Sequence, residues 1–271
     1  MTTTIPPHVL TPTRRSARAW RATMIVLATL VVLVLTGLMA AQTTWSWWVM
    51  RGYSQTSAQV ALPGASAVSI RSGVGDIEVI VGDVTEPTLA LVDEGSLLLP
   101  GDGATALARI TVEGPASSPA VTVEQPATSG PVPWEDEHKK ILLVVPRSGL
   151  STTELSTDVG SVSVTGPVGV VEASTGTGDV QVLGVPADAR VTASTGVGDI
   201  DVQVDAAGPS SDLDLSTEVG DISVLVPPDG GWVVDADSDT GDIYLEPGLE
   251  TGGLGAGIRA RTSVGDISLT S

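Results

Sequence analysis

The sequence of 271 residues contains no cysteine and only two histidines. Without cysteine the chain has no disulfide, no thiolate metal ligand and no cysteine nucleophile. His8 lies near the N-terminus and His138 in a charged stretch, so neither is placed to activate a serine nucleophile. We therefore predict that the protein is not an enzyme and has no catalytic or cofactor-binding residues.

Aromatic residues are also scarce: they make up 3% of the sequence, and phenylalanine is absent. Hydrophobic residues nevertheless make up 42%, mainly valine, leucine, isoleucine and alanine, which excludes a wholly disordered chain. A core of small and β-branched side chains favours strands over helices. The composition therefore predicts an all-β fold.

Basic residues are few and unevenly placed. The formal net charge is −19, yet residues 1–51 contain five arginines and no acidic residue, which leaves 8 basic and 32 acidic residues in the remainder. An acidic surface of this kind repels the phosphate backbone of DNA and RNA. We therefore predict no nucleic-acid partner.

Residues 22–41 form an apolar run of 20 residues without a charge or a proline, which is the length that a helix needs to cross a bilayer. Four arginines precede the run, so the positive-inside rule places residues 1–21 in the cytoplasm and the C-terminal part outside. We predict a single-pass protein of the cell membrane, with a linker over residues 42–62. A cleaved signal peptide is the alternative, and it would export the same part of the chain.

One sequence unit occurs seven times after the apolar run. The copies are SIRSGVGDIEVIV, ELSTDVGSVSVTG, EASTGTGDVQVLG, TASTGVGDIDVQV, DLSTEVGDISVLV, DADSDTGDIYLEP and RARTSVGDISLTS. Their anchoring glycines are Gly75, Gly160, Gly178, Gly198, Gly220, Gly241 and Gly265. The last six glycines follow one another at about 20 residues, a period typical of solenoids.

Each unit alternates apolar and polar residues on both sides of its glycine turn, which predicts two half-buried strands per copy. We expect successive copies to stack directly on one another as a parallel β-helix or β-solenoid over residues 151–271. The alternative is that each turn joins an antiparallel hairpin. Stacking requires Ile200 to lie in register between Val180 and Ile222, and hairpins do not.

The segment from Val81 to Leu150 interrupts the repeats. It contains short strand candidates separated by glycine and proline clusters: Thr88–Val92, Ala108–Glu113, Ala120–Glu124 and Ile141–Val145. We predict that residues 63–150 form an N-terminal β region, made of the first repeat and of diverged rungs or a cap. A cap is expected because the end of a solenoid exposes unpaired backbone.

An aspartate follows the turn glycine in six of the seven copies: Asp76, Asp179, Asp199, Asp221, Asp242 and Asp266. In one hypothesis these stacked carboxylates form a calcium ladder, because calcium binds carboxylate and carbonyl oxygens. In the other, each aspartate accepts a hydrogen bond from a neighbouring backbone N–H and locks the turn. Ser161 stands at this position in the remaining copy and suits only the second hypothesis. The Ser–Thr pairs before the turns are expected to form a polar ladder along a strand edge.

At the repeated unit, as in residues 216–224 (STEVGDISV), the chain resembles the bacterial putative-adhesin domains of unknown function. The resemblance covers roughly residues 60–271. It implies a non-enzymatic, membrane-anchored binding or scaffolding module, with a cell-wall polymer or an envelope protein as partner. The alternatives are an accessory sensor of cell-envelope stress and a polysaccharide-active β-helix enzyme.

Overall fold

A computed structural model describes residues 24, 31, 53–126, 139–206, 208, 211–228, 231–249 and 256–271. The chain divides into two compact units, Met1–Met50 and Arg51–Ser271, and all described strands belong to the second. The predicted cytoplasmic tail, most of the predicted span over residues 22–41, and His138 lie outside the described residues. No helix within the described ranges is long and apolar enough to cross a membrane.

From Tyr53 onward the described residues contain strands and no α-helix, so the prediction of an all-β fold is confirmed. The strands form two sheets of ten. The first sheet contains, in spatial order, β1 (Ser54–Ser57), β6 (Thr105–Glu113), β7 (Ala120–Glu124), β3 (Ala67–Val74), β9 (Leu150–Val159), β11 (Val168–Thr177), β13 (Arg190–Val197), β15 (Asp212–Val219), β19 (Gly257–Val264) and β17 (Val233–Thr240). The second contains β18 (Ile243–Leu245), β20 (Ile267–Thr270), β16 (Ile222–Leu225), β14 (Ile200–Val204), β12 (Val180–Val185), β10 (Val162–Thr165), β4 (Ile77–Val81), β8 (Lys140–Val145), β5 (Thr88–Val92) and β2 (Gln59–Ala61).

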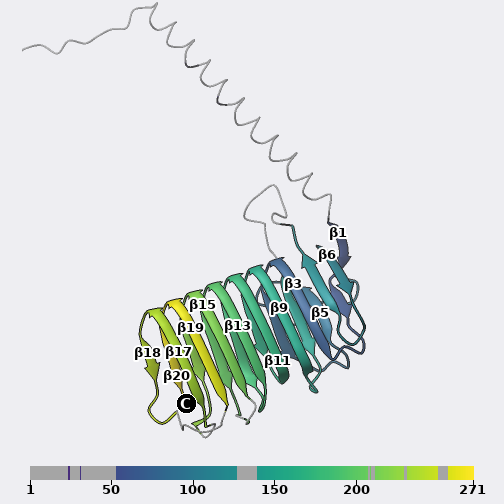
Figure 1. Cartoon of the computed structure of the whole chain (residues 1–271). Coiled ribbons are helices and arrows are strands. Elements are labelled where there is room, and N and C mark those ends of the chain that lie inside the picture. Colours follow the sequence, from purple (N-terminus) through teal and green to yellow (C-terminus); the bar gives the residue numbers. More distant parts are fainter. Residues whose placement is uncertain are drawn as a thin grey trace, which may run out of the picture. The chain divides into compact units, whose positions relative to one another are not determined.

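Each sequence repeat contributes one strand to each sheet, and we call such a pair a rung. Neighbouring rungs lie side by side along the stack (Figure 1). Ile200 on β14 pairs in parallel with Val180 on one side and with Ile222 on the other, as stacking requires. The two strands of a repeat belong to different sheets, so the hairpin alternative is wrong for the seven repeats.

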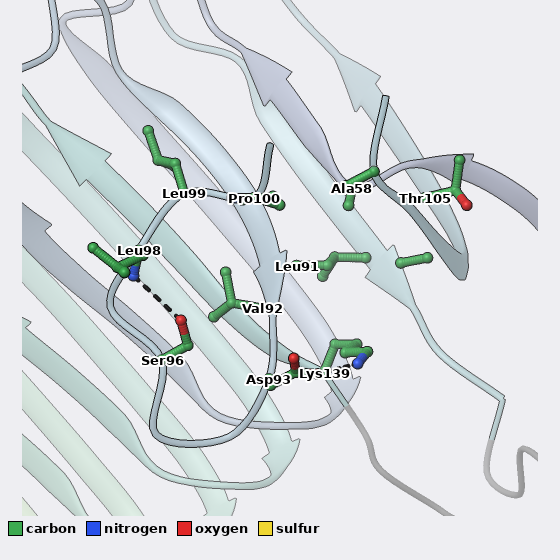
Figure 2. A pocket seen from close by; sticks show the side chains of 12 residues that line it. Ala58, Leu91, Val92, Asp93, Ser96, Leu98, Leu99, Pro100, Thr105 and Lys139 are labelled. Atoms are coloured by element: carbon green, nitrogen blue, oxygen red, sulfur yellow. Dashed lines mark hydrogen bonds and ion pairs between the residues drawn. The ribbon is translucent and has the colours of Figure 1, made fainter. Parts of the chain in front are cut away.

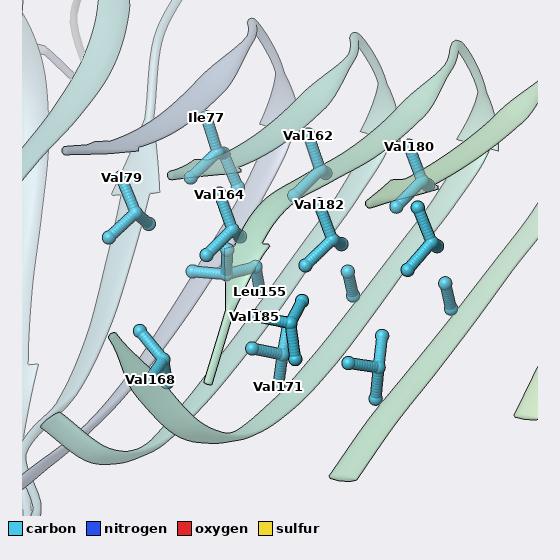
Figure 3. Packing of buried hydrophobic residues seen from close by; sticks show 14 of the residues in the cluster. Ile77, Val79, Leu155, Val162, Val164, Val168, Val171, Val180, Val182 and Val185 are labelled. Atoms are coloured by element: carbon cyan, nitrogen blue, oxygen red, sulfur yellow. The ribbon is translucent and has the colours of Figure 1, made fainter. Parts of the chain in front are cut away.

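The space between the sheets is filled by columns of apolar side chains, with one member per rung. In the second sheet, one column consists of Ile77, Val162, Val180, Ile200, Ile222 and Ile267, each at most 1% exposed. Figure 3 shows part of this column beside the parallel one formed by Val79, Val164 and Val182. Because each branched side chain packs on the same position of the next rung, the stack has one continuous core.

The N-terminal end of the stack is closed by strands that the repeat does not predict. β7 and β8 form one further parallel rung against β3 and β4, and β6 and β5 then pair antiparallel with them. Two strand candidates, Thr88–Val92 and Ala120–Glu124, have the predicted bounds. The predicted linker over residues 42–62 is wrong for β1 and β2, which form the outermost strands because β6 and β5 offer them unpaired edges.

The last two repeats stack in the reverse of their sequence order, so the expectation that every copy lies on its predecessor is wrong there. The final rung, β19–β20, lies between β15–β16 and β17–β18. Arg259 on β19 thereby contacts Asp214 on β15 at 3.5 Å and Asp235 on β17 at 3.5 Å. Stacking in sequence order would place those two aspartates opposite each other, which is unfavourable.

One interior position of the stack carries an unpaired polar atom. Thr153 on β9 is fully buried, and its Oγ1 has no hydrogen-bond partner among the described residues. Its neighbours in the column are Val68 and Val171. The hydroxyl therefore loses its hydration on folding without compensation.

We expect Thr153→Val to stabilise the protein by about 1 kcal/mol, because valine has nearly the same shape and no group that needs a hydrogen bond. Urea unfolding followed by circular dichroism measures the change. Thr152→Val is the matched control, since Thr152 is only partly buried and faces outward on the same strand. An unchanged or lower midpoint for the Thr153 variant would contradict the expectation.

Candidate functional site

The turns between the two strands of each rung form a column of stacked glycines. Gly198 has a φ of 148°, and a Cβ placed on it would lie 2.0 Å from the carbonyl oxygen of Gly178 in the adjacent rung. Gly220 meets the oxygen of Gly198 at the same distance. These glycines are therefore required both by the backbone conformation and by the close approach of the next turn.

The aspartates that follow these glycines form a continuous hydrogen-bonded ladder. In each step, Oδ1 of one aspartate accepts a hydrogen bond from the backbone N–H at the same position of the next rung. The steps run from Ser161 N to Asp76 (2.8 Å), Asp199 N to Asp179 (2.9 Å), Asp221 N to Asp199 (2.8 Å), Asp266 N to Asp221 (2.7 Å) and Asp242 N to Asp266 (2.8 Å). Ser161 fills its place with Oγ, which accepts from the N–H of Asp179 at 3.3 Å.

The aspartates therefore accept hydrogen bonds from neighbouring backbone N–H groups, as the second hypothesis predicted, but each bond joins two rungs and does not close one turn. Five of the six carboxylates use Oδ1 in the ladder, which leaves their second oxygen for other partners, and the exception is Asp242 at the end of the ladder. Among the described residues, no group of three or more histidine, aspartate or glutamate side chains is placed to hold one metal ion. A calcium ladder at these six aspartates stays a prediction.

The threonines of the Ser–Thr pairs point into the stack and bind the same turns from inside. Thr175 Oγ1 donates to the carbonyl oxygen of Gly160 at 2.7 Å, and Thr195 Oγ1 donates to that of Gly178 at 2.9 Å. Both side chains are buried. Thr157, Thr217 and Thr262 repeat the contact, with Ser238 in the terminal rung. The threonines therefore form a ladder inside the stack and not the expected polar ladder along a strand edge.

A shallow groove of about 340 Å³ runs beside the aspartate ladder on the outer face of the second sheet. Its polar lining comes from three successive rungs: Ser161, Ser163, Asp179, Gln181, Asp199 and Asp201. Gln181 lies in register between Ser163 and Asp201, so the lining repeats along the stack. The groove offers hydroxyl, amide and carboxylate groups at the spacing of neighbouring strands, about 4.8 Å.

A second hollow, of about 290 Å³, lies in the N-terminal β region (Figure 2). Leu91 and Val92 of β5 line one side, and Leu98 of the following loop lines another and is 79% exposed. Lys139 pairs with Asp93 at its rim. This lining mixes apolar and polar groups and does not repeat along the stack.

The sequence predicted the aspartates but not the groove, because the groove depends on which outward side chains of different repeats become neighbours. Gln181 and Asp201 are ordinary exposed strand residues in their own repeats. The hollow in the N-terminal β region was also not predictable, because its walls come from β5, β6 and a loop whose packing the repeat does not encode.

Comparisons with known proteins give two similar solved structures. A putative cell adhesion protein from Clostridium sporogenes is 13% identical, with a TM-score of 0.42, over 80% of this chain and 99% of that one. A putative adhesin from Bacteroides fragilis is 13% identical, with a TM-score of 0.32, over 80% of this chain and 97% of that one. No protein-family model and no curated protein matches the chain.

Proposed function

We propose that the chain is a non-enzymatic, adhesin-like binding or scaffolding module of the cell envelope. Residues 63–271 form a β-solenoid, and residues 22–41 hold it at the outer face of the membrane. Its partner is an extended cell-wall polymer with regularly spaced hydroxyl and amide groups. The groove beside the aspartate ladder carries the proposal, because its polar groups repeat from rung to rung as the groups of such a polymer do.

The chemistry of the groove suits this class of ligand. Carboxylate and amide oxygens accept hydrogen bonds from hydroxyl groups, and the amide nitrogen of Gln181 donates one. Asp179 and Asp199 are fixed by the ladder, so binding requires little ordering of their side chains. The groove also spans three rungs of the second sheet, so it suits an extended chain better than a small compact molecule.

We expect Gln181→Leu to weaken the binding of solubilised wall polymer to membranes that carry the full chain by about tenfold, because it removes two hydrogen-bonding groups from the groove. Gln203→Leu is the matched control. Gln203 is also exposed on the outer face of the second sheet, on β14 next to β12, but it does not line the groove. Cosedimentation of labelled polymer measures both. Equal losses for the two variants, or no binding by the unaltered chain, would rule out the groove as the polymer site.

A further inference from the structure

The rung β17–β18 ends both sheets, so each of its strands has one unpaired edge among the described residues. The opposite end of the stack is closed by the antiparallel strands of the N-terminal region. Ile243 on β18 is 47% exposed, whereas Ile222 and Ile267 at the same position of inner rungs are at most 1% exposed. The terminal rung therefore leaves both backbone and apolar surface open to a further strand.

Acidic residues occupy alternate positions on the outward side of β17: Asp235, Asp237 and Asp239. On the covered side of this strand lies β19, whose arginines supply the opposite charge. Arg261 lies 3.3 Å from Asp235, and Arg259 lies 3.5 Å from it. Asp237 and Asp239 form no ion pair among the described residues. Strand β17 thus already pairs with one strand that carries a basic residue at every second position. Asp237 and Asp239 remain available for ion pairs with a further strand.

The hydrogen-bonding groups of the terminal turn are also open. Asp242 is the last aspartate of the ladder, and no backbone N–H of a described residue reaches its carboxylate. In the inner rungs, the same group binds the next strand, as Asp221 binds the N–H of Asp266. A strand added outside β17–β18 would therefore gain ladder contacts as well as sheet pairing.

We propose that this edge binds an extended segment of a partner protein with a basic residue at every second position, which adds a further strand to the first sheet. The acidic side chains also exclude the most readily available wrong partner, a second copy of β17, because like charges would lie opposite each other. The edge is therefore selective for basic strands and resists self-association. This site is separate from the polymer groove, which lies several rungs away.

The probe is a synthetic peptide with the sequence of residues 257–271, GIRARTSVGDISLTS, which has the required pattern and already pairs with β17 inside the protein. Its control is the same peptide with glutamate in place of both arginines. We expect fluorescence anisotropy with the full chain in detergent to show the arginine peptide binding at least about tenfold more tightly, with the difference falling as salt rises.

The matching variant of the chain is Asp237→Lys with Asp239→Lys, which should reverse the preference between the two peptides. The control variant is Asp158→Lys with Glu172→Lys, two outward acids on inner strands of the same sheet, and it should leave the preference unchanged. Equal affinity for both peptides, no binding of the arginine peptide, or the same reversal in the control variant would overturn the proposal. A doubled mass by light scattering without peptide would identify a second copy as the occupant and would also overturn it.

Discussion

Replacing Gly198 by alanine should lower the free energy of unfolding by about 3–5 kcal/mol. The added Cβ would lie 2.0 Å from the carbonyl oxygen of Gly178, and that oxygen belongs to the backbone of a fixed turn. The φ of 148° adds conformational strain for any residue with a side chain. Because Thr195 donates a hydrogen bond to the same oxygen, a shift of the turn would also break an internal contact.

Gly101→Ala is the matched control for this substitution. Gly101 lies in the loop after β5, has no positive φ, and would bring its Cβ within 4 Å of nothing. We expect a change of about 0.5 kcal/mol or less for this variant. Urea unfolding of the full chain in detergent, followed by far-ultraviolet circular dichroism, measures both. Similar midpoints for the two variants would show that adjacent turns do not stack as closely as the glycine column requires.

The repeat explains how much of this architecture the sequence predicts. A motif that recurs with the same alternation must place equivalent residues in equivalent surroundings, so Ile200 could be placed between Val180 and Ile222 from the sequence alone. The role of the aspartates followed from a single exception. Ser161 accepts a hydrogen bond as an aspartate does, and the structure shows it accepting from the N–H of Asp179.

The order of the last two rungs was not predicted, because repetition specifies that rungs stack but not which rung follows which. The deciding differences are small departures from the motif. Arg259 and Arg261 suit a position between acidic strands, and β17 has acidic outward residues that suit an edge. Exposed ion pairs of this kind contribute about 0–1 kcal/mol each, so the two orders differ by little in charge alone. Ile258 of β19 and Val234 of β17 occupy the same register position, and this order buries the larger of the two side chains, which also favours it.

The N-terminal end was predicted only in outline for a different reason. β1 and β2 are short and mostly polar, and they are strands because β6 and β5 offer them unpaired edges. Their structure depends on a long-range partner and not on their own sequence pattern, so the sequence of this short polar segment predicts only a linker. The candidate groove has the same origin, since Gln181 gains its role from neighbours that lie about 20 residues away in the chain.

Replacing three successive ladder aspartates, Asp179, Asp199 and Asp221, by alanine should cost about 3 kcal/mol of stability, because each substitution leaves a backbone N–H without its acceptor. The same three positions changed to asparagine should be close to neutral. Asparagine keeps an acceptor oxygen, and it removes the repulsion between carboxylates that lie on adjacent strands. Urea unfolding of both triple variants and the unaltered chain measures the difference.

The same variants separate hydrogen bonding from cation binding. If the aspartates act through the ladder, millimolar calcium should leave the melting temperature of the unaltered chain unchanged, because the carboxylates stand one per rung and do not surround a common point. If they hold calcium, the ion should raise the melting temperature of the unaltered chain and should have no effect on the asparagine variant, since binding to the folded state alone stabilises it. A calcium-dependent rise in melting temperature that the asparagine substitutions abolish would therefore assign the aspartates to metal binding. A loss of stability in the alanine variant alone would assign them to the hydrogen bonds between turns of adjacent rungs.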